Sequence, residues 1–194
     1  MKFTKIRDVK TPSRGTNKSA GIDFFVPNYS EDFVDKLINL EREDSEKIKD
    51  LISLNKRFIK SIDEKGFIVE SLGRVFIPSG IKVLVPQSCD FTAHNKGGVA
   101  TKYGLIFGAQ LVDEDYFGEI FISIINCSPD AISIQFGQKI TQFVVRKVEY
   151  ENVELVTPEE LHYYHLKINS NRGDGSLGST GTHWQLIKFI VFYL

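Results

Sequence analysis

Short alternating runs of apolar and polar residues dominate the chain from Arg74 onward. They are rich in Val, Ile and Phe, and Gly, Pro, Asn or Asp separates them, which is the pattern of short β-strands joined by turns. Two similar runs lie nearer the N-terminus. We expect strands at Lys2–Ile6, Ile22–Val26, Arg74–Ile77, Ile81–Val85, Asp90–Ala93, Leu105–Val112, Glu119–Ile125, Ala131–Gln135 and Ile140–Val148. This spacing predicts an all-β sandwich or jelly roll.

Residues Ser30–Lys65 break the strand pattern because charges dominate and apolar residues recur at helical spacing. Val34, Leu37 and Ile38 form one such set, and Ile48, Leu51 and Ile52 form another. We therefore expect two amphipathic helices inserted as a hairpin into the β fold. The hairpin either covers apolar surface of the β domain or serves as a docking surface for a protein partner.

The C-terminal part of the chain has a different composition. Residues Asn169–Thr182 are rich in glycine and contain Leu177 as their single apolar residue, so we expect a mobile arm there. Residues 183–194 are an apolar tail, which suits a strand, a segment on a neighbouring subunit or an exposed end. The predicted organisation is a β domain at 1–168, a glycine-rich lid at 169–182 and the tail at 183–194.

Global composition favours a soluble protein of ordinary charge. The 194 residues carry a formal net charge of -1, so no excess of basic residues indicates nucleic acid or an anionic membrane as a partner. The two cysteines, Cys89 and Cys127, are not spaced as metal ligands. With no apolar leader or membrane-spanning run at hand, we expect a cytoplasmic protein.

Candidate chemistry first appears in Val112–Glu119, which places three carboxylates beside Tyr116 and a flexible Gly118. Between two strands this segment would form a hairpin turn, and acids at such a tip are usually solvated. The glycines of Arg172–Gly181 leave N–H groups free for an anion, although such runs are often linkers. His162 and His165 lack the further ligands that a metal site needs.

Taken in order, five short segments resemble the motifs of the trimeric all-β dUTP pyrophosphatases (dUTPases). The resemblance covers nearly the whole chain apart from Ser30–Lys65 and the last twelve residues. It implies a distorted jelly-roll barrel, a homotrimer, Mg²⁺ as cofactor and dUTP as substrate. The matching segments are Ala20–Phe24, Asn95–Lys102, Gly108–Gly118, Gly137–Gln142 and Arg172–Gly181.

The first, second and fourth motifs are those that grip phosphate in the family. By resemblance, Asp23 and Gln142 hold the Mg²⁺-bound triphosphate through water, and Lys96, Gly97 and Gly98 lie in the substrate site. Lys96 stands where the family has arginine, and lysine lacks the planar two-pronged grip. Gly97 replaces a serine whose hydroxyl helps to hold the phosphates beside the scissile bond. The family's Asp–Arg pair before Gln142 has become Gln138–Lys139, which we expect to alter a structural ion pair.

The third motif matches best. The resemblance implies that Asp113 is the general base for the attacking water and that Tyr116 stacks under the deoxyribose and excludes a 2′-hydroxyl. The hairpin backbone, including Gly108, would read the uracil edge. Gln110 departs from the family, which usually has glycine at that position.

The fifth motif implies a lid that closes over the nucleotide from another subunit. Arg172, Ser179 and Thr180 would bind the terminal phosphates, and Leu177 with Gly178 would cover the base. Leu177 replaces the family's phenylalanine, and lost base stacking is worth about 1–3 kcal/mol in nucleic-acid binding proteins.

The sequence thus predicts a pyrophosphohydrolase that converts dUTP to dUMP and pyrophosphate. The departures at Gly97, Gln110 and Leu177 leave open a shifted pyrimidine deoxynucleotide specificity. A catalytically weak binding or regulatory protein that acts through the helical insertion is the other alternative. The order of the motifs reverses the interpretation of Asp113 as part of a merely solvated turn.

Overall fold

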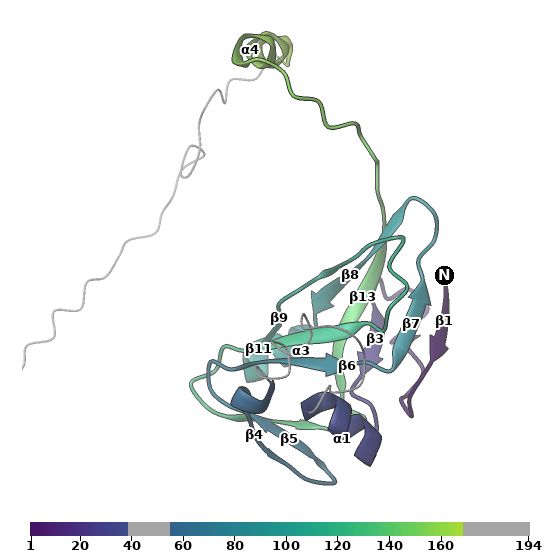
Figure 1. Ribbon diagram of the computed structural model, residues 1–194, viewed down its shortest axis with the longest axis vertical. Helices are drawn as coiled ribbons and strands as arrows, with labels where there is room; N and C mark the ends of the chain where they lie inside the picture. The colour runs from purple at the N-terminus through teal and green to yellow at the C-terminus, as the bar shows by residue number, and fades with distance from the viewer. Residues whose placement is uncertain (39–54, 169–194) are drawn as a thin grey trace, which may run out of the picture. The chain divides into compact units, whose positions relative to one another are not determined.

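The computed structural model describes residues 1–38 and 55–168 (Figure 1). The chain divides into two compact units, Met1–Tyr150 and Glu151–Leu194. The first unit consists mainly of short strands, which confirms the predicted all-β class. Within the described ranges, no helix has the length and apolarity needed to span a membrane.

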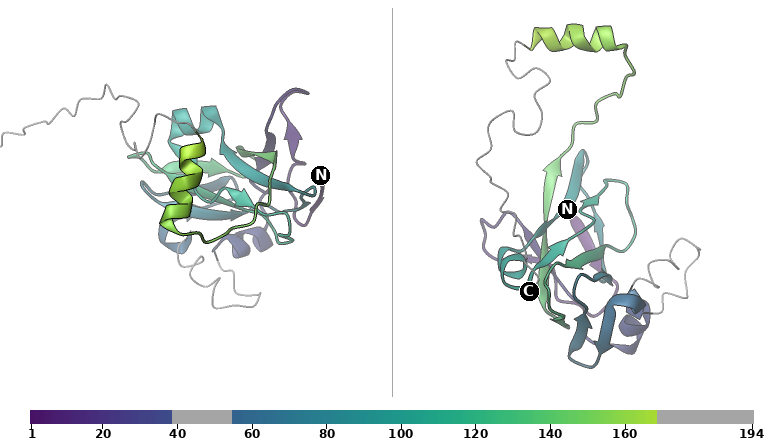
Figure 2. Two further views of the ribbon diagram at one scale, coloured as in Figure 1. Left: turned by 90° about the horizontal axis from the view of Figure 1, so that it is seen from above. Right: turned by 90° about the vertical axis from the view of Figure 1, so that its left-hand side faces the viewer.

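A five-stranded sheet carries most of the residues of interest, and β13 is its longest strand (Figure 2). β13 pairs antiparallel with β8 on one side and with β3 on the other. Gln142 thereby lies opposite both Asp23 and His94. The order of the strands across the sheet is β10 (Leu111–Val112), β8 (Cys89–Asn95), β13 (Lys139–Lys147), β3 (Ile22–Phe25) and β2 (Ser13–Arg14).

Three smaller sheets complete the β unit. One joins β6 (Arg74–Pro78), β11 (Phe121–Asn126) and β9 (Leu105–Phe107). A second joins β12 (Ile132–Gln135), β5 (Gly66–Val69) and β4 (Ile59–Ile62). The third pairs β1 (Lys2–Lys5) with β7 (Ile81–Leu84).

Aromatic side chains fill the core behind the five-stranded sheet. Phe24, Phe91 and Phe143 are each at most 1% exposed. The Phe91 and Phe143 rings stack with centroids 4.7 Å apart, and Phe24 lies 4.6 Å from Phe143. Because these three residues come from β8, β13 and β3, the core fixes the register of the strands that carry the candidate site.

The inserted segment begins with helix α1 (Glu31–Ile38), as the apolar spacing predicted. Ser30 accepts a hydrogen bond from the Phe33 amide through its hydroxyl, 3.1 Å away, which is the contact of a helix-capping residue. Phe33 and Leu37 are 1% and 0% exposed, so α1 covers apolar surface of the β unit. The second expected helix falls largely outside the described residues, and β4 corrects the predicted helical character before Lys65.

Two further predictions need correction. The expected strand Leu105–Val112 is broken, because the chain pairs with β11 through Phe107 and then with β8 through Leu111. The Ala93 amide donates to the Gln110 carbonyl at 2.8 Å, which marks this change of partner. The sequence predicted the strand after Gly118 as the hairpin partner. Leu105–Phe107 does pair with that strand, whereas Leu111–Val112 pairs with β8.

Two helices lie where none was predicted. Helix α3 (Gly97–Tyr103) lies in the second motif, where the sequence analysis expected neither a strand nor a helix, and Gly104 ends it with a φ of 64°. Helix α4 (Pro158–Lys167) belongs to the second unit. Thr157 and Glu160 cap α4 reciprocally, with proline in its first turn.

Candidate functional site

A charged cluster lies where β3, β8 and β13 meet. Asp23 on β3 is 3% exposed. The Lys96 ammonium is 2.5 Å from one of its carboxylate oxygens, and the Lys139 ammonium is 2.6 Å from the other. Three segments that are far apart in sequence therefore converge on one buried carboxylate.

The two lysines determine the charge state of Asp23. Burial by itself would raise the pKa of this carboxyl group. The hydrogen bonds and positive charges of Lys139 and Lys96 outweigh burial and hold the pKa below its usual value of 3.8. Asp23 is therefore an anion at neutral pH, and each lysine is a cation held at a defined place.

Gln142 lies beside this cluster and packs against the backbone of the first motif. Its side-chain amide donates to the Asn95 carbonyl at 3.0 Å. A Cβ atom on Gly21 would lie 2.4 Å from the Gln142 amide oxygen. Only glycine at position 21 allows this approach, so the first and fourth motifs are fitted to each other.

Gly97 and Gly98 form the start of α3, next to Lys96. Both are exposed, and a Cβ atom added to either would have no heavy atom within 4 Å. The described part of the chain thus leaves room at position 97 for the serine side chain that the family motif has there.

The acidic segment Val112–Glu119, called the hairpin from here on, forms the turn that follows β10. Asp113 is exposed, and its carbonyl accepts a hydrogen bond from the Tyr116 amide at 3.2 Å. Residues 113–116 thus form a turn, as the sequence predicted for this segment. Gly108 precedes this segment and donates to the Ser123 carbonyl at 2.9 Å.

Tyr116 has a fixed position within the hairpin. Its hydroxyl donates to the Glu119 carbonyl at 2.7 Å. Its ring lies so close to Gly118 that a Cβ atom there would be 2.3 Å from the hydroxyl oxygen. Partial burial and the charge of Glu119 raise the pKa of Tyr116 above its usual value of 10, so the phenol remains a hydrogen-bond donor at neutral pH.

Two carboxylates of this region were not among the predicted site residues. Glu114 accepts hydrogen bonds from the Ser88 amide and from the Tyr150 hydroxyl, each at 2.8 Å. The hydrogen bond to Glu114, with smaller contributions from burial and nearby carboxylates, raises the pKa of Tyr150 to about 12. Glu119 is buried and accepts from Arg7 and the Gly80 amide. In the sequence, Glu114 and Glu119 are simply two more acids of an acidic segment, so nothing there indicates their hydrogen-bond partners.

Lys139 was also missed as a member of the site. The sequence indicated only an altered ion pair at this position, whereas the structure places its ammonium on Asp23. The signal was a cation three residues before Gln142 on the same strand. Neither its partner nor its register is visible without the pairing of β13 with β3.

The predicted site residues form two groups within one chain. Val112 pairs with Phe91 near the first residues of β8, so Asp113 lies at that end of the strand. Lys96 directly follows the last residue of β8, at the opposite end. At about 3.3 Å per residue, roughly 15–20 Å separates the two positions.

The remaining predicted site residues are not among those that the structure describes. Arg172, Leu177, Gly178, Ser179 and Thr180 lie outside the described residues, as does the apolar tail. Among residues 1–38 and 55–168, no group of three or more His, Cys, Asp or Glu side chains is arranged to hold a metal ion by itself.

The family model described as dUTPase matches residues 63–181, which is more than half of the chain. The chain belongs to the dUTPase family. A relative from Fusobacterium nucleatum subsp. nucleatum, named deoxyuridine 5'-triphosphate nucleotidohydrolase, is 32% identical over 120 residues. The matched region covers 61% of this chain and 77% of that relative.

Solved dUTPase structures share the fold. A Staphylococcus bacteriophage 80alpha dUTPase mutant with dUpNHpp aligns over 93% of this chain and 98% of its own, with a TM-score of 0.60 and 15% identity. A mutant dUTPase from phage phi11 of S. aureus, described with a structural Mg(II) ion, aligns over 80% of this chain and 95% of its own. Its TM-score is 0.57 at 14% identity. These likenesses confirm the jelly-roll type of fold that the sequence predicted.

Proposed function

We propose that this chain hydrolyses dUTP to dUMP and pyrophosphate. The observation that carries the proposal is the convergence of Asp23, Lys96 and Gln142, from three separate motifs, at one end of the five-stranded sheet. The family relatives named as dUTP nucleotidohydrolases support the same reaction. Hydrolysis of a phosphoanhydride requires alignment and charge neutralisation more than covalent chemistry.

The Asp23 cluster is the proposed triphosphate end of the site. Lys96 and Lys139 carry the positive charge that a leaving pyrophosphate needs. The N–H groups of Gly97 and Gly98 lie beside Lys96, with open space above them. A triphosphate that enters here competes with Asp23 for both ammonium groups.

The residues present fit a Mg²⁺ ion that is carried by the nucleotide. Asp23 and Gln142 offer oxygen atoms, and magnesium is often held through water by one or two carboxylates plus substrate phosphates. Asp23 and Gln142 would hold that water shell, and the ion would neutralise the phosphate charge. The buried, ionised state of Asp23 suits this role.

The hairpin is the proposed nucleoside end of the site. Asp113, which is exposed, would orient the attacking water and accept its proton. The fixed ring of Tyr116 would lie under the deoxyribose and leave no room for a 2′-hydroxyl. The backbone from Gly108 onward would read the uracil edge.

Assembly into a homotrimer completes this proposal. Asp113 and the Lys96–Gly97 segment must both approach the α-phosphorus, yet roughly 15–20 Å of β8 separates them in one chain. A second subunit brings the two ends together. Another subunit would contribute the arm with Arg172, Leu177, Gly178, Ser179 and Thr180. The free thiols of Cys89 and Cys127 fit a reducing cytoplasmic setting.

A pyrophosphate-release assay with all deoxynucleoside triphosphates, with and without Mg²⁺, tests the function. We expect dUTP to be turned over in preference to dCTP, dTTP and UTP, and only with the metal. Preference for another pyrimidine deoxynucleotide would replace dUTP as the substrate, and absence of any turnover would reject the enzyme. A monomeric native mass would reject the trimer.

A further inference from the structure

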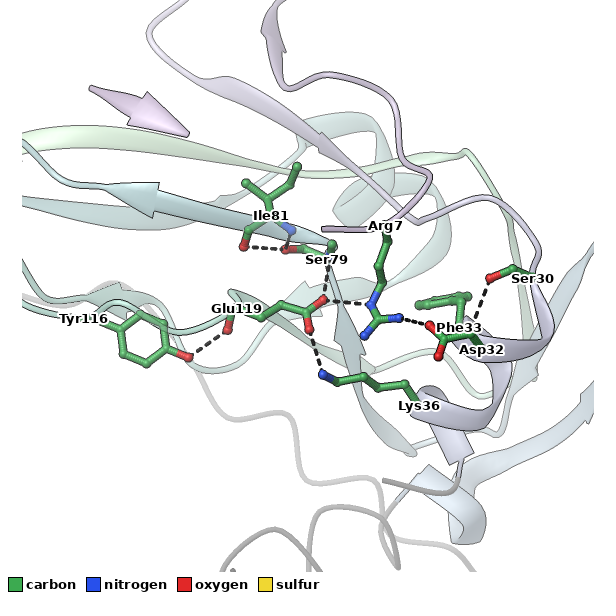
Figure 3. Close-up of polar contacts among 10 residues, drawn as sticks. Arg7, Ser30, Asp32, Phe33, Lys36, Ser79, Ile81, Tyr116 and Glu119 are labelled. Carbon is green, nitrogen blue, oxygen red and sulfur yellow. Dashed lines mark hydrogen bonds and ion pairs between the residues drawn. The ribbon is translucent and has the colours of Figure 1, made fainter. Parts of the chain in front are cut away.

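Glu119 is a buried carboxylate that the proposed reaction does not use. Its side chain is 5% exposed. One oxygen accepts from the Gly80 amide at 2.7 Å and from Arg7 at 3.3 Å (Figure 3). The other oxygen accepts no hydrogen bond from the described residues. Its compensating charge is the Lys36 ammonium, 3.2 Å away.

Lys36 comes from the inserted helix α1, not from the jelly roll. The burial of Phe33 and Leu37 fixes the face of α1 that lies on the β unit, so Lys36 reaches Glu119 from a defined place. Asp32 on the same helix pairs with Arg7 at 2.5 Å. The insertion therefore supplies one cation to Glu119 directly and holds the second through Asp32.

Glu119 in turn anchors Tyr116. The hydroxyl of Tyr116 donates to the backbone carbonyl of Glu119, as Figure 3 shows. The neighbouring Ile120 is tied to the turn between β6 and β7 by two backbone hydrogen bonds, both at 3.0 Å, with Ser79 and Ile81. The place of the Tyr116 ring thus depends on where the Glu119 segment rests.

We propose that the inserted helix α1 positions Tyr116, with Lys36 acting through Glu119, so that sugar discrimination depends on the insertion. A buried carboxylate that loses one of its counter-charges must move toward solvent or recruit water. Either change shifts the carbonyl that holds the Tyr116 hydroxyl. Lys36 is thus a positioning residue, and the inference rests on the proposed role of Tyr116 in dUTP hydrolysis.

The test compares Lys36→Met with Lys36→Arg and with Asp35→Asn in the full chain. Methionine keeps the length of the side chain but removes its charge, and arginine restores a cation. Asp35 is exposed on the same helix and forms no ion pair among the described residues, so its variant is the matched control. Circular dichroism and thermal melting define conditions in which every variant is folded.

Two readouts are measured. The first is the ratio of kcat/KM for dUTP to that for UTP, which we expect to fall about tenfold in Lys36→Met, a size typical of coupled neighbours. The second is amide hydrogen exchange of the 113–120 peptide without nucleotide. We expect exchange about tenfold faster there, although no residue of that peptide is changed. Lys36→Arg and Asp35→Asn keep both values near those of the wild type.

The double variant Lys36→Met/Glu119→Gln tests whether Lys36 acts on Tyr116 through Glu119. With the uncompensated charge removed, we expect both readouts to recover most of the way toward wild type. A double variant as impaired as Lys36→Met, or a folded Lys36→Met variant with unchanged exchange and discrimination, overturns the inference. A wild type without dUTP turnover rejects the proposed function instead, and the exchange measurement still reports the link from Lys36 to Tyr116.

Discussion

The two ends of the candidate site are stabilised in different ways. At the phosphate end, Asp23 is held by two ammonium groups, and these are the same groups that an incoming triphosphate would bind. At the hairpin end, Tyr116 is held by a backbone carbonyl and by close contact with Gly118. At the proposed phosphate end, the two ammonium groups would have to leave Asp23 for a triphosphate, whereas Tyr116 already has its hydrogen bond within the hairpin.

This difference agrees with where the sequence departs from the family pattern. Lys96, Gly97 and Lys139 replace family residues at the phosphate end, while Asp113 and Tyr116 match at the hairpin, and Gln110 just before the hairpin departs from the family. At the phosphate end, lysine in place of arginine keeps the positive charge but loses the planar two-pronged contact with phosphate. A shape defined by backbone contacts tolerates far less change. If the two ends act independently, a substitution at one end leaves the properties of the other end unchanged.

The largest expected effect is at the hairpin. Asp113→Asn removes the proposed general base, and such catalysis contributes typically ~10²–10⁴-fold. Because Asp113 is exposed and its carbonyl makes the turn contact, the variant folds and binds dUTP with nearly unchanged affinity. Steady-state kinetics and calorimetric binding of a non-hydrolysable analogue measure the two quantities. Turnover within about threefold of wild type would remove Asp113 from this role.

Gly118→Ala tests whether the fixed shape of the hairpin matters. The added methyl group would lie 2.3 Å from the Tyr116 hydroxyl oxygen, so the ring must move, and a misplacement of about 1 Å can cost up to about 100-fold in rate. We expect the ratio of dUTP to UTP turnover to fall. Gly15→Ala is the control, since its methyl meets only ordinary contacts at 3.5 Å or more. An equal ratio of dUTP to UTP turnover in the two variants would show that the close contact of Gly118 with Tyr116 does not control sugar discrimination.

Gly97→Ser addresses the phosphate end by restoring the family hydroxyl. Nothing lies within 4 Å of the new Cβ atom, so the substitution is free of steric cost. A hydrogen bond to a charged phosphate is worth about 1.5–3 kcal/mol, and we expect kcat/KM for dUTP to rise about tenfold. The same assay on Asp113→Asn/Gly97→Ser should show the same relative gain. A loss of activity in the single variant would contradict the resemblance at this position.

The smallest effect is a pH dependence of stability. The pKa of Asp23 is lower in the folded chain than its usual value of 3.8, so its ion pairs stabilise the fold fully above that value. This stabilisation is lost as pH falls through the lower folded pKa. Urea unfolding of wild type and Asp23→Asn should differ at pH 7 and converge below pH 3.8. A constant difference across that range would show that the lysines do not act on an ionised Asp23.

The sequence predicted much of the β unit because its strands alternate in polarity and pack one face on the core. Such a pattern could not show that Leu105–Val112 changes partners, since pairing depends on distant strands. Helix α3 was missed because two glycines begin it, and glycine is a poor helix former. Helix α4 could have been predicted, since Thr157 and Glu160 have the spacing of a capping box and Pro158 suits the first turn of a helix.

The sequence proposed residues for the candidate site but could not show which of them contact one another, and their roles stay predictions. Motif order identified Asp23, Lys96 and Gln142, and strand register explains why they meet. The pairing of Lys139 with Asp23 is a contact over a long sequence distance, and so are the ion pairs of Glu119 with Arg7 and Lys36. A single sequence carries the charge of such residues but not the identity of their partners.

The pairing of Lys36 with Glu119 also bears on how the chain can be shortened. A shortened chain without α1 would keep a carboxylate in the protein interior beside Arg7 alone. Helix α1 is thus a structural requirement of the β unit that it covers. A minimal version of the protein would need Glu119→Gln alongside the deletion, and the order of those two changes would determine whether each intermediate is stable.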